Sequence, residues 1–277
     1  MQQAAEAVAQ IRQQRPHQIL GIHFEGPHIS QAKKGAHCSG FIRPLGDAEW
    51  SVLARTDLGV KLITVAPEMV SPAEIQRLIE LGCVVFLGHS NATYEQTQAA
   101  LAAGAHGFTH LFNAMSANTA RAPGMVTAAL LDPASFCGLI VDGHHVAYPS
   151  CQLALRCKGT SRIALVTDAM PPVGTKETHF TLVDRQVTRY GDKLVAHSGE
   201  LAGSVLDMAS ALRLCIHRLQ VPWQEALLMA TQVPLQALQL TPPSPLLQAG
   251  VAANFVLLDA DFYVRQCWLA GQAMMQQ

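Results

Sequence analysis

The residues with the clearest chemical potential in this sequence are polar side chains that end apolar runs. Each of them follows an apolar run of strand length: Glu25, His89, His110, His144, His145 and Asp168. The carboxyl ends of successive parallel strands meet at one face of a barrel, where catalytic residues gather. We therefore expect these side chains to lie close together in the folded chain.

Glu25, His89 and His110 form a set of two histidines and one carboxylate. Such a set binds Zn²⁺ or Fe²⁺ and leaves positions open for water and substrate. A bound metal lowers the pKa of its water to about 7 and polarises a carbonyl group. Asp168 is the candidate to take the proton of that water and deliver it to a leaving amine. The pattern therefore indicates metal-dependent hydrolysis.

Each of these residues also has a structural explanation. Glu25 and Asp168 can cap the turns or helices that follow them, and His89 can bond to the backbone at a helix start. His110 can be a core histidine whose hydrogen bonds are satisfied. Short matches of this kind often arise by chance, but four of them at corresponding strand ends favour a shared site.

The segments that position these residues alternate between strands and helices. Strands are expected over residues 18–25, 60–68, 83–90, 106–112, 136–145 and 162–169, and helices over 2–15, 71–82, 93–104 and 149–157. Two of the helices begin with capping boxes, Ser71 with Glu74 and Thr93 with Gln96. Strands that are apolar throughout are typical of parallel sheets covered on both faces. The fold class is therefore α/β, either a (β/α) barrel or a doubly wound sheet.

The pattern changes after residue 175. Residues 178–200 alternate between polar and apolar side chains and predict small antiparallel strands. Helices are expected near 204–219 and 222–232, and a proline-rich linker over 240–250. Two terminal strands are expected within 252–272. We therefore predict a barrel domain over residues 1–240, followed over 241–277 by the linker and the strands of a small sandwich domain.

The composition excludes several classes of protein. The chain has 277 residues, of which 14% are charged and 49% hydrophobic, and its net charge is −1. It has no basic stripe for nucleic acid, and no apolar run reaches the roughly 18 residues of a membrane span. The N-terminal residues are polar, without the apolar stretch of a signal peptide. Its seven cysteines lack a C-x-x-C pair, which favours reduced thiols and a cytoplasmic location.

Several motifs occur along nearly the whole chain, from residue 18 to near its end. They are HFEGPH, KKGAH (33–37), GHSNAT (88–93), THLFNAM (109–115), VDGHHV (141–146), LVTDA (165–169) and LAGSVLDM (201–208). In these motifs and their order, the sequence resembles the N-acetylglucosamine-6-phosphate deacetylase family of the amidohydrolase superfamily. The resemblance implies a (β/α)8 barrel that hydrolyses N-acetyl-D-glucosamine 6-phosphate to glucosamine 6-phosphate and acetate in amino-sugar catabolism. No nucleotide-binding G-x-G-x-x-G or Walker motif follows any strand.

The resemblance also implies the chemistry of the reaction. Glu25, His89 and His110 match the ligands of one divalent metal ion, Zn²⁺ or Fe²⁺. Asp168 matches the general base and acid. His37 matches a histidine that contacts the substrate and polarises its acetyl carbonyl, although alone it would be an ordinary loop histidine.

The resemblance further implies how the sugar phosphate is bound. Asn113, Ala114 and Arg121 match residues that hold it, although Arg121 alone would be an ordinary surface arginine. His145 matches a histidine that is donated to the phosphate site of a neighbouring subunit, which implies a homodimer. The loop that contains Ala202 and Gly203 is expected to line the sugar pocket.

The sequence departs from the family pattern at its N-terminus. Family members begin with sandwich strands and two βα units, whereas residue 1 here begins the helix before the third family strand. We therefore expect six barrel strands where the fold has eight. The alternatives to an active deacetylase are an inactive remnant that binds sugar phosphate, a deacetylase of N-acetylgalactosamine 6-phosphate, and an amidohydrolase acting on another amide, such as a cyclic one. The FNAM motif with Arg121 argues against the last of these.

Overall fold

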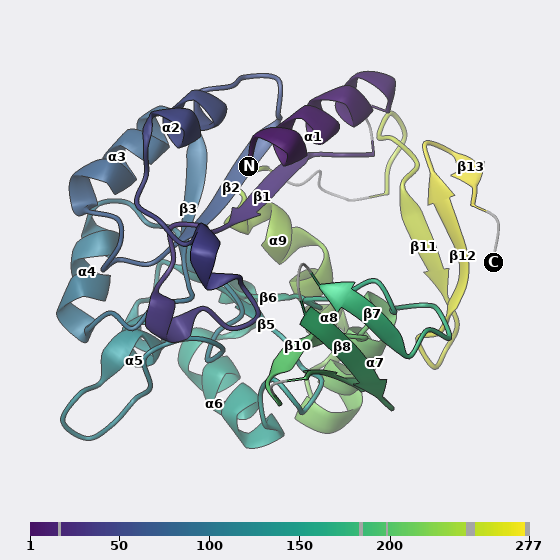
Figure 1. Ribbon diagram of the computed structural model, residues 1–277. Helices are drawn as coiled ribbons and strands as arrows, with labels where there is room; N and C mark the ends of the chain where they lie inside the picture. Colours follow the sequence, from purple (N-terminus) through teal and green to yellow (C-terminus); the bar gives the residue numbers. More distant parts are fainter. Residues whose placement is uncertain (16–17, 183–184, 198, 242–246, 275–277) are drawn as a thin grey trace.

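Six parallel strands, in the order in which they occur along the chain, form the central sheet (Figure 1). They are β1 (Gly21–Glu25), β2 (Val60–Val65), β3 (Cys83–Leu87), β4 (Gly107–Phe108), β5 (Phe136–Leu139) and β6 (Ile163–Leu165). This computed structural model describes residues 1–15, 18–182, 185–197, 199–241 and 247–274. The predicted α/β class and the six parallel strands are confirmed. The strands are shorter than expected. Glu25 is the last residue of β1, whereas the polar residues that follow β3, β4, β5 and β6 lie in loops.

Helices precede each of the six strands. They are α1 (Gln2–Gln14), α2 (Asp47–Leu53), α3 (Pro72–Glu80), α4 (Tyr94–Ala102), α5 (Gly124–Leu131) and α6 (Tyr148–Lys158). Both predicted capping boxes are present: the Ser71 side chain accepts from the Glu74 N–H, and the Thr93 side chain accepts from the Gln96 N–H. Sequence analysis missed α2 and α5. Helix α5 is apolar around its whole circumference, so it lacks the one-sided pattern by which a surface helix is recognised.

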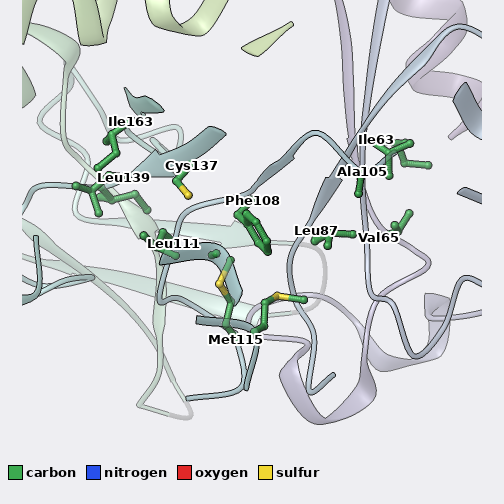
Figure 2. Packing of buried hydrophobic residues seen from close by; sticks show 14 of the residues in the cluster. Ile63, Val65, Leu87, Ala105, Phe108, Leu111, Met115, Cys137, Leu139 and Ile163 are labelled. Atoms are coloured by element: carbon green, nitrogen blue, oxygen red, sulfur yellow. The ribbon is translucent and has the colours of Figure 1, made fainter. Parts of the chain in front are cut away.

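The two faces of the central sheet pack against different elements. Side chains that point outward, such as Ile63, Val65, Leu87 and Phe108, form one large core with the surrounding helices (Figure 2). The inward-facing side chains at the amino-terminal half of the sheet pack against two residues of helix α9 (Gln232–Ala237), and this cluster is Val84, Phe86, Phe136, Ala164, Val233 and Ala237. Because side chains alternate along a strand, the inner face is left free for polar residues near the carboxyl ends.

A four-stranded antiparallel sheet is attached to the carboxyl end of β6. It consists of β7 (His179–Leu182), β8 (Arg185–Tyr190), β9 (Lys193–Ala196) and β10 (Leu201–Ser204). The Ser204 N–H donates to the Asp168 carbonyl oxygen at 2.8 Å, and the Met170 N–H donates to the Ser204 carbonyl oxygen at 2.9 Å. The small antiparallel strands predicted over 178–200 are therefore confirmed where the structure describes them; residues 183–184 and 198 lie outside the described residues.

The C-terminal part contains helices α7 (Met208–Leu219), α8 (Trp223–Ala230) and α9, followed by an antiparallel sheet. That sheet consists of β11 (Phe255–Leu258), β12 (Val264–Leu269) and β13 (Gln272–Ala273), so the described residues contain one strand more than predicted. The helix expected over 222–232 is interrupted at Thr231, whose backbone leaves the helical conformation. Part of the predicted linker, residues 242–246, and residues 275–277 lie outside the described residues, and the division into two domains stays a prediction.

Candidate metal and active site

Three side chains from the ends of β1, β3 and β4 converge on one point. Glu25 Oε1 lies 3.1 Å from His89 Nε2 and 2.9 Å from His110 Nε2, and the two nitrogens are 3.0 Å apart. A tetrahedral zinc ion with bonds of about 2.0–2.1 Å holds its ligands about 3.3 Å from one another. The triangle of ligand atoms therefore has the size that a small divalent cation requires.

The charge at this triangle also suits a cation. Burial raises the pKa of the Glu25 carboxyl, but hydrogen bonds from His110 and His89 outweigh that effect and hold the pKa far below its usual range. The carboxylate is therefore negatively charged at neutral pH. Two imidazole nitrogens beside one carboxylate oxygen form a donor set that fits Zn²⁺ or Fe²⁺.

The second nitrogen of His89 fixes its tautomer. His89 Nδ1 lies 2.8 Å from the carbonyl oxygen of Lys33, the last residue of the short helix η1 (Gln31–Lys33). A carbonyl oxygen only accepts hydrogen bonds, so Nδ1 carries a proton, and Nε2 is the ring nitrogen that faces Glu25. Metal-binding histidines almost always donate their other N–H in this way, and the sequence alone did not reveal this contact.

The backbone is strained at four of the predicted site residues. His89, His110, Ala114 and Asp168 have φ angles of 47°, 35°, 49° and 50°, in the left-handed region. If β3 and β4 continued as extended strands, the side chains of His89 and His110 would point outward, as those of Leu87 and Phe108 do. The left-handed backbone at each histidine ends this alternation. Such conformations cost about 1–3 kcal/mol each and cluster at functional sites. The strain therefore marks the same carboxyl ends that the residue types indicated.

A cavity of about 410 Å³ opens beside the triangle. Most of the predicted site residues line it: Glu25, His37, His89, His110, Asn113, Ala114, His145, Asp168 and Gly203. Two predicted residues are not part of the lining. Arg121 lies exposed on the loop before α5, and Ala202 is fully buried with Val187 and Leu194 in the core of the small sheet. The structure therefore brings together the predicted ligands and Asp168 but not every predicted substrate contact.

His37 lies against the metal triangle. Its ring meets that of His89 edge to face, with centroids 4.7 Å apart. One ligand atom each from His37, Glu25 and His89 also lie within 4.8 Å of one another. Burial lowers the pKa of His37, so its imidazole is neutral at neutral pH. A neutral imidazole in this position can donate one hydrogen bond to a bound substrate.

His145 faces the cavity of its own chain. Its Nδ1 lies 2.6 Å from Asp142 Oδ2, and its backbone N–H donates to Asp142 Oδ1 at 2.8 Å. Both side chains are less than one-tenth exposed. The structure describes a single chain, so the predicted donation of His145 to a neighbouring subunit stays a prediction. Asp142 holds both the main chain and the ring of His145, and sequence analysis missed Asp142.

The remaining wall of the cavity is apolar. It includes side chains from the loop after β1 and from the small sheet with its connection: Ile29, Phe41, Ile42, Met170, Leu182 and Leu201. Sequence analysis did not predict these residues as part of the site, because nothing in their spacing distinguishes them from core residues. An apolar wall opposite a charged cluster lowers the local dielectric and strengthens the electrostatic interactions within the site.

The model of the amidohydrolase family matches residues 1–274. The chain belongs to the amidohydrolase family. It is 47% identical over 276 residues to the N-acetylgalactosamine-6-phosphate deacetylase of Shewanella sp. (strain ANA-3). This match covers 100% of the present chain and 70% of the Shewanella protein. It is 38% identical to the N-acetylglucosamine-6-phosphate deacetylase of Vibrio furnissii, over 92% of this chain and 64% of that protein.

Solved structures agree with this assignment. The N-acetylglucosamine-6-phosphate deacetylase of Pasteurella multocida superimposes with a TM-score of 0.92 at 32% identity, covering 100% of this amidohydrolase and 73% of that chain. A variant of the Mycobacterium smegmatis enzyme in complex with N-acetyl-D-glucosamine 6-phosphate gives a TM-score of 0.87 at 34% identity, over 97% and 72%. The predicted resemblance to these deacetylases and the amidohydrolase fold are confirmed. This chain spans about two thirds of the length of the curated relatives it matches.

Proposed function

We propose that this amidohydrolase is a metal-dependent deacetylase that converts N-acetyl-D-glucosamine 6-phosphate to glucosamine 6-phosphate and acetate in amino-sugar catabolism. The observation that carries the proposal is the triangle of Glu25, His89 and His110, with sides of 2.9–3.1 Å, which opens on the cavity beside Asp168. The names of its relatives support the acetylated sugar phosphate as substrate.

Glu25, His89 and His110 would hold one divalent cation, Zn²⁺ or Fe²⁺. The cation, when bound, supplies a Lewis acid for the acetyl carbonyl and a water of lowered pKa. His89 is already oriented for this role, because the Lys33 carbonyl oxygen fixes the proton on its Nδ1. The negative charge of Glu25 balances part of the charge of the ion.

Asp168 would move the proton. Its carboxylate takes one proton from water as the water oxygen bonds to the acetyl carbon, and delivers it to the sugar nitrogen as the carbon–nitrogen bond breaks. His37, neutral because it is buried, would donate a hydrogen bond to the carbonyl oxygen while negative charge develops there. The products are acetate and the free amine.

The sugar phosphate would lie along the opposite part of the cavity. His145 would contact it, since the carboxylate of Asp142 bonds to Nδ1 and leaves Nε2 as the ring nitrogen available to a ligand. Asn113, Ala114 and Gly203 line the same cavity. The roles predicted for Arg121 and Ala202 stay predictions; for Arg121 to contact the phosphate, its exposed loop would have to approach a cavity that it does not line.

Metal analysis and acetate release test the proposal. Purified protein is loaded with Zn²⁺ or Fe²⁺, and acetate is measured with N-acetylglucosamine 6-phosphate. N-acetylglucosamine without the phosphate serves as the control substrate. We expect about one metal per chain, acetate release that a chelator abolishes, and little release from the unphosphorylated sugar. A folded protein that binds metal but releases no acetate would refute the activity and favour the inactive sugar-phosphate binder.

N-acetylgalactosamine 6-phosphate is the second candidate substrate. The specific observation in its favour is the 47% identity to the Shewanella deacetylase of that name. The two sugars differ in the configuration of one hydroxyl group, so kcat/KM for both decides between them. A site that hydrogen-bonds that hydroxyl discriminates strongly between the two, and the sugar with the higher kcat/KM is the substrate.

The finer properties of the protein are also proposals. We place it in the cytoplasm, which is consistent with its seven free cysteines, four of them buried. Among the described residues, no helix is long and apolar enough to cross a membrane. We propose a homodimer by analogy with the predicted family. Light scattering of the purified protein measures the oligomeric state directly.

A further inference from the structure

Three polar side chains form a hydrogen-bonded chain on the inner face of the central sheet, below the metal triangle. His23 Nε2 lies 2.7 Å from Thr64 Oγ1, and Thr64 Oγ1 lies 2.6 Å from Thr109 Oγ1. Thr64 is fully buried and Thr109 nearly so. These residues come from β1, from β2 and from the end of β4, and none of them lines the cavity.

Each member of this chain adjoins a proposed metal ligand. His23 lies two residues before Glu25 and so shares its face of β1. Thr64 is the residue of β2 paired with Glu25, and its carbonyl oxygen accepts from the Gly26 N–H at 3.2 Å. Thr109 directly precedes His110, whose backbone is in the left-handed region.

The bond between the two threonines crosses over β3. Thr64 belongs to β2 and Thr109 follows β4, and β3 lies between these strands. The residue beneath the bond is Gly88, which directly precedes His89. A Cβ atom on Gly88 would lie 2.9 Å from Thr64 Cγ2 and 3.1 Å from Thr109 Cβ. Because Gly88 has no side chain, the two threonines can meet above it. Gly88 directly precedes His89, so the contact between the threonines also adjoins this third proposed ligand.

Packing alone does not account for this arrangement. A pair of valines would fill the same space, and a buried hydroxyl is tolerated only when it is hydrogen-bonded. Hydrogen bonds are directional, so they set the rotamers of both threonines and the spacing of the strand ends that carry the ligands. Residues that orient metal ligands from outside the coordination shell change metal affinity by about 10–100-fold when they are replaced.

We propose that His23, Thr64 and Thr109 form a positioning network that holds Glu25, His89 and His110 at the separation a divalent cation requires. The inference rests on the metal site of the proposed function and assigns a role to residues that touch neither cation nor substrate. It predicts that metal affinity depends on a hydroxyl group one layer below the ligands.

The test compares three threonine variants by Zn²⁺ titration against a chromophoric chelator. Thr64→Val removes the hydroxyl and keeps the shape, and Thr64→Ser keeps the hydroxyl. Thr97→Val is the matched control, since Thr97 is also fully buried and its hydroxyl donates to the Thr93 carbonyl oxygen at 2.8 Å, remote from the site in helix α4. We expect Zn²⁺ affinity to fall about 10–100-fold in Thr64→Val, to remain within about threefold of wild type in Thr64→Ser, and to be unchanged in Thr97→Val.

Wild-type affinity in Thr64→Val would overturn the proposal, as would an equal loss in Thr97→Val. If Thr64→Val does not fold, His23→Leu decides, because His23 is the least buried member of the network. Zn²⁺ affinity must fall in His23→Leu and recover in His23→Gln. Acetate release is measured in parallel. A wild-type protein that binds Zn²⁺ without releasing acetate refutes the proposed function, while the affinity ratios still decide the role of the network.

Discussion

Replacement of Asp168 by asparagine isolates proton transfer from the other roles of this residue. Asp168 has a φ angle of 50°, a region that asparagine and aspartate tolerate better than other residues with a side chain. Its carbonyl oxygen accepts from the Ser204 N–H at 2.8 Å, and asparagine keeps that bond. Asp168→Asn therefore changes the charge and basicity of the side chain with little change in shape.

The expected magnitudes follow from these contacts. Loss of a general base and acid lowers kcat by about 10²–10⁴, or roughly 3–5 kcal/mol of activation free energy. The free energy of unfolding of Asp168→Asn stays within about 0.5 kcal/mol of wild type. Asp168→Ala loses the same activity but is about 1 kcal/mol less stable than the asparagine variant, because alanine in the left-handed region has no local hydrogen bond to compensate.

Three measurements on the same preparations test this reasoning. Acetate release at saturating substrate gives kcat, elemental analysis gives the metal content, and urea denaturation gives the free energy of unfolding. We expect both variants to lose activity and to keep wild-type metal content. The two variants differ only in stability.

Three results would contradict the reasoning. A kcat within threefold of wild type in Asp168→Asn would remove Asp168 from proton transfer. Loss of bound metal in the same variant would make Asp168 a ligand rather than a base. Equal stability of the asparagine and alanine variants would show that the left-handed backbone at this position imposes no measurable cost.

Three further substitutions probe the scaffold of the site by urea denaturation. Gly88→Ala should destabilise the protein by about 1–3 kcal/mol, because its Cβ would be 2.9 Å from Thr64 Cγ2; unchanged stability would mean that the strands separate freely there. Burial raises the pKa of the Asp142 carboxyl, but hydrogen bonds from His145 outweigh it and lower that pKa. Asp142→Asn should therefore be less stable than wild type at pH 7, with a difference that is full above about pH 4 and is lost as the pH falls further; a pH-independent difference would contradict this. Lys61→Met should lower the free energy of unfolding by about 3 kcal/mol. The reason is that the buried Lys61 Nζ donates to three main-chain carbonyls near the ends of α2 and α3 at 2.6–2.9 Å. A decrease below about 1 kcal/mol would show that water replaces the ammonium group.

The sequence by itself predicted the parallel strands, several of the helices and the residues that meet at the candidate site. Apolar runs and capping boxes such as Ser71 with Glu74 are local patterns, so the parallel strands and several helices could be predicted without any tertiary contact. The convergence of Glu25, His89 and His110 was also predictable, because parallel strands place their carboxyl ends on one side of a sheet. Helix α5 was missed because its uniformly apolar sequence has no amphipathic period.

Only the tertiary structure decided how the site is held. The Lys33 carbonyl that fixes His89, the Asp142 carboxylate that holds His145, and the threonine pair across Gly88 join segments whose proximity depends on the whole fold. The burial of Ala202 and the exposure of Arg121 likewise depend on how the small sheet and the loop before α5 pack. Residue types and spacing specify which groups can react, whereas distances between segments remote in sequence fix their orientation, and these arise only when the chain packs.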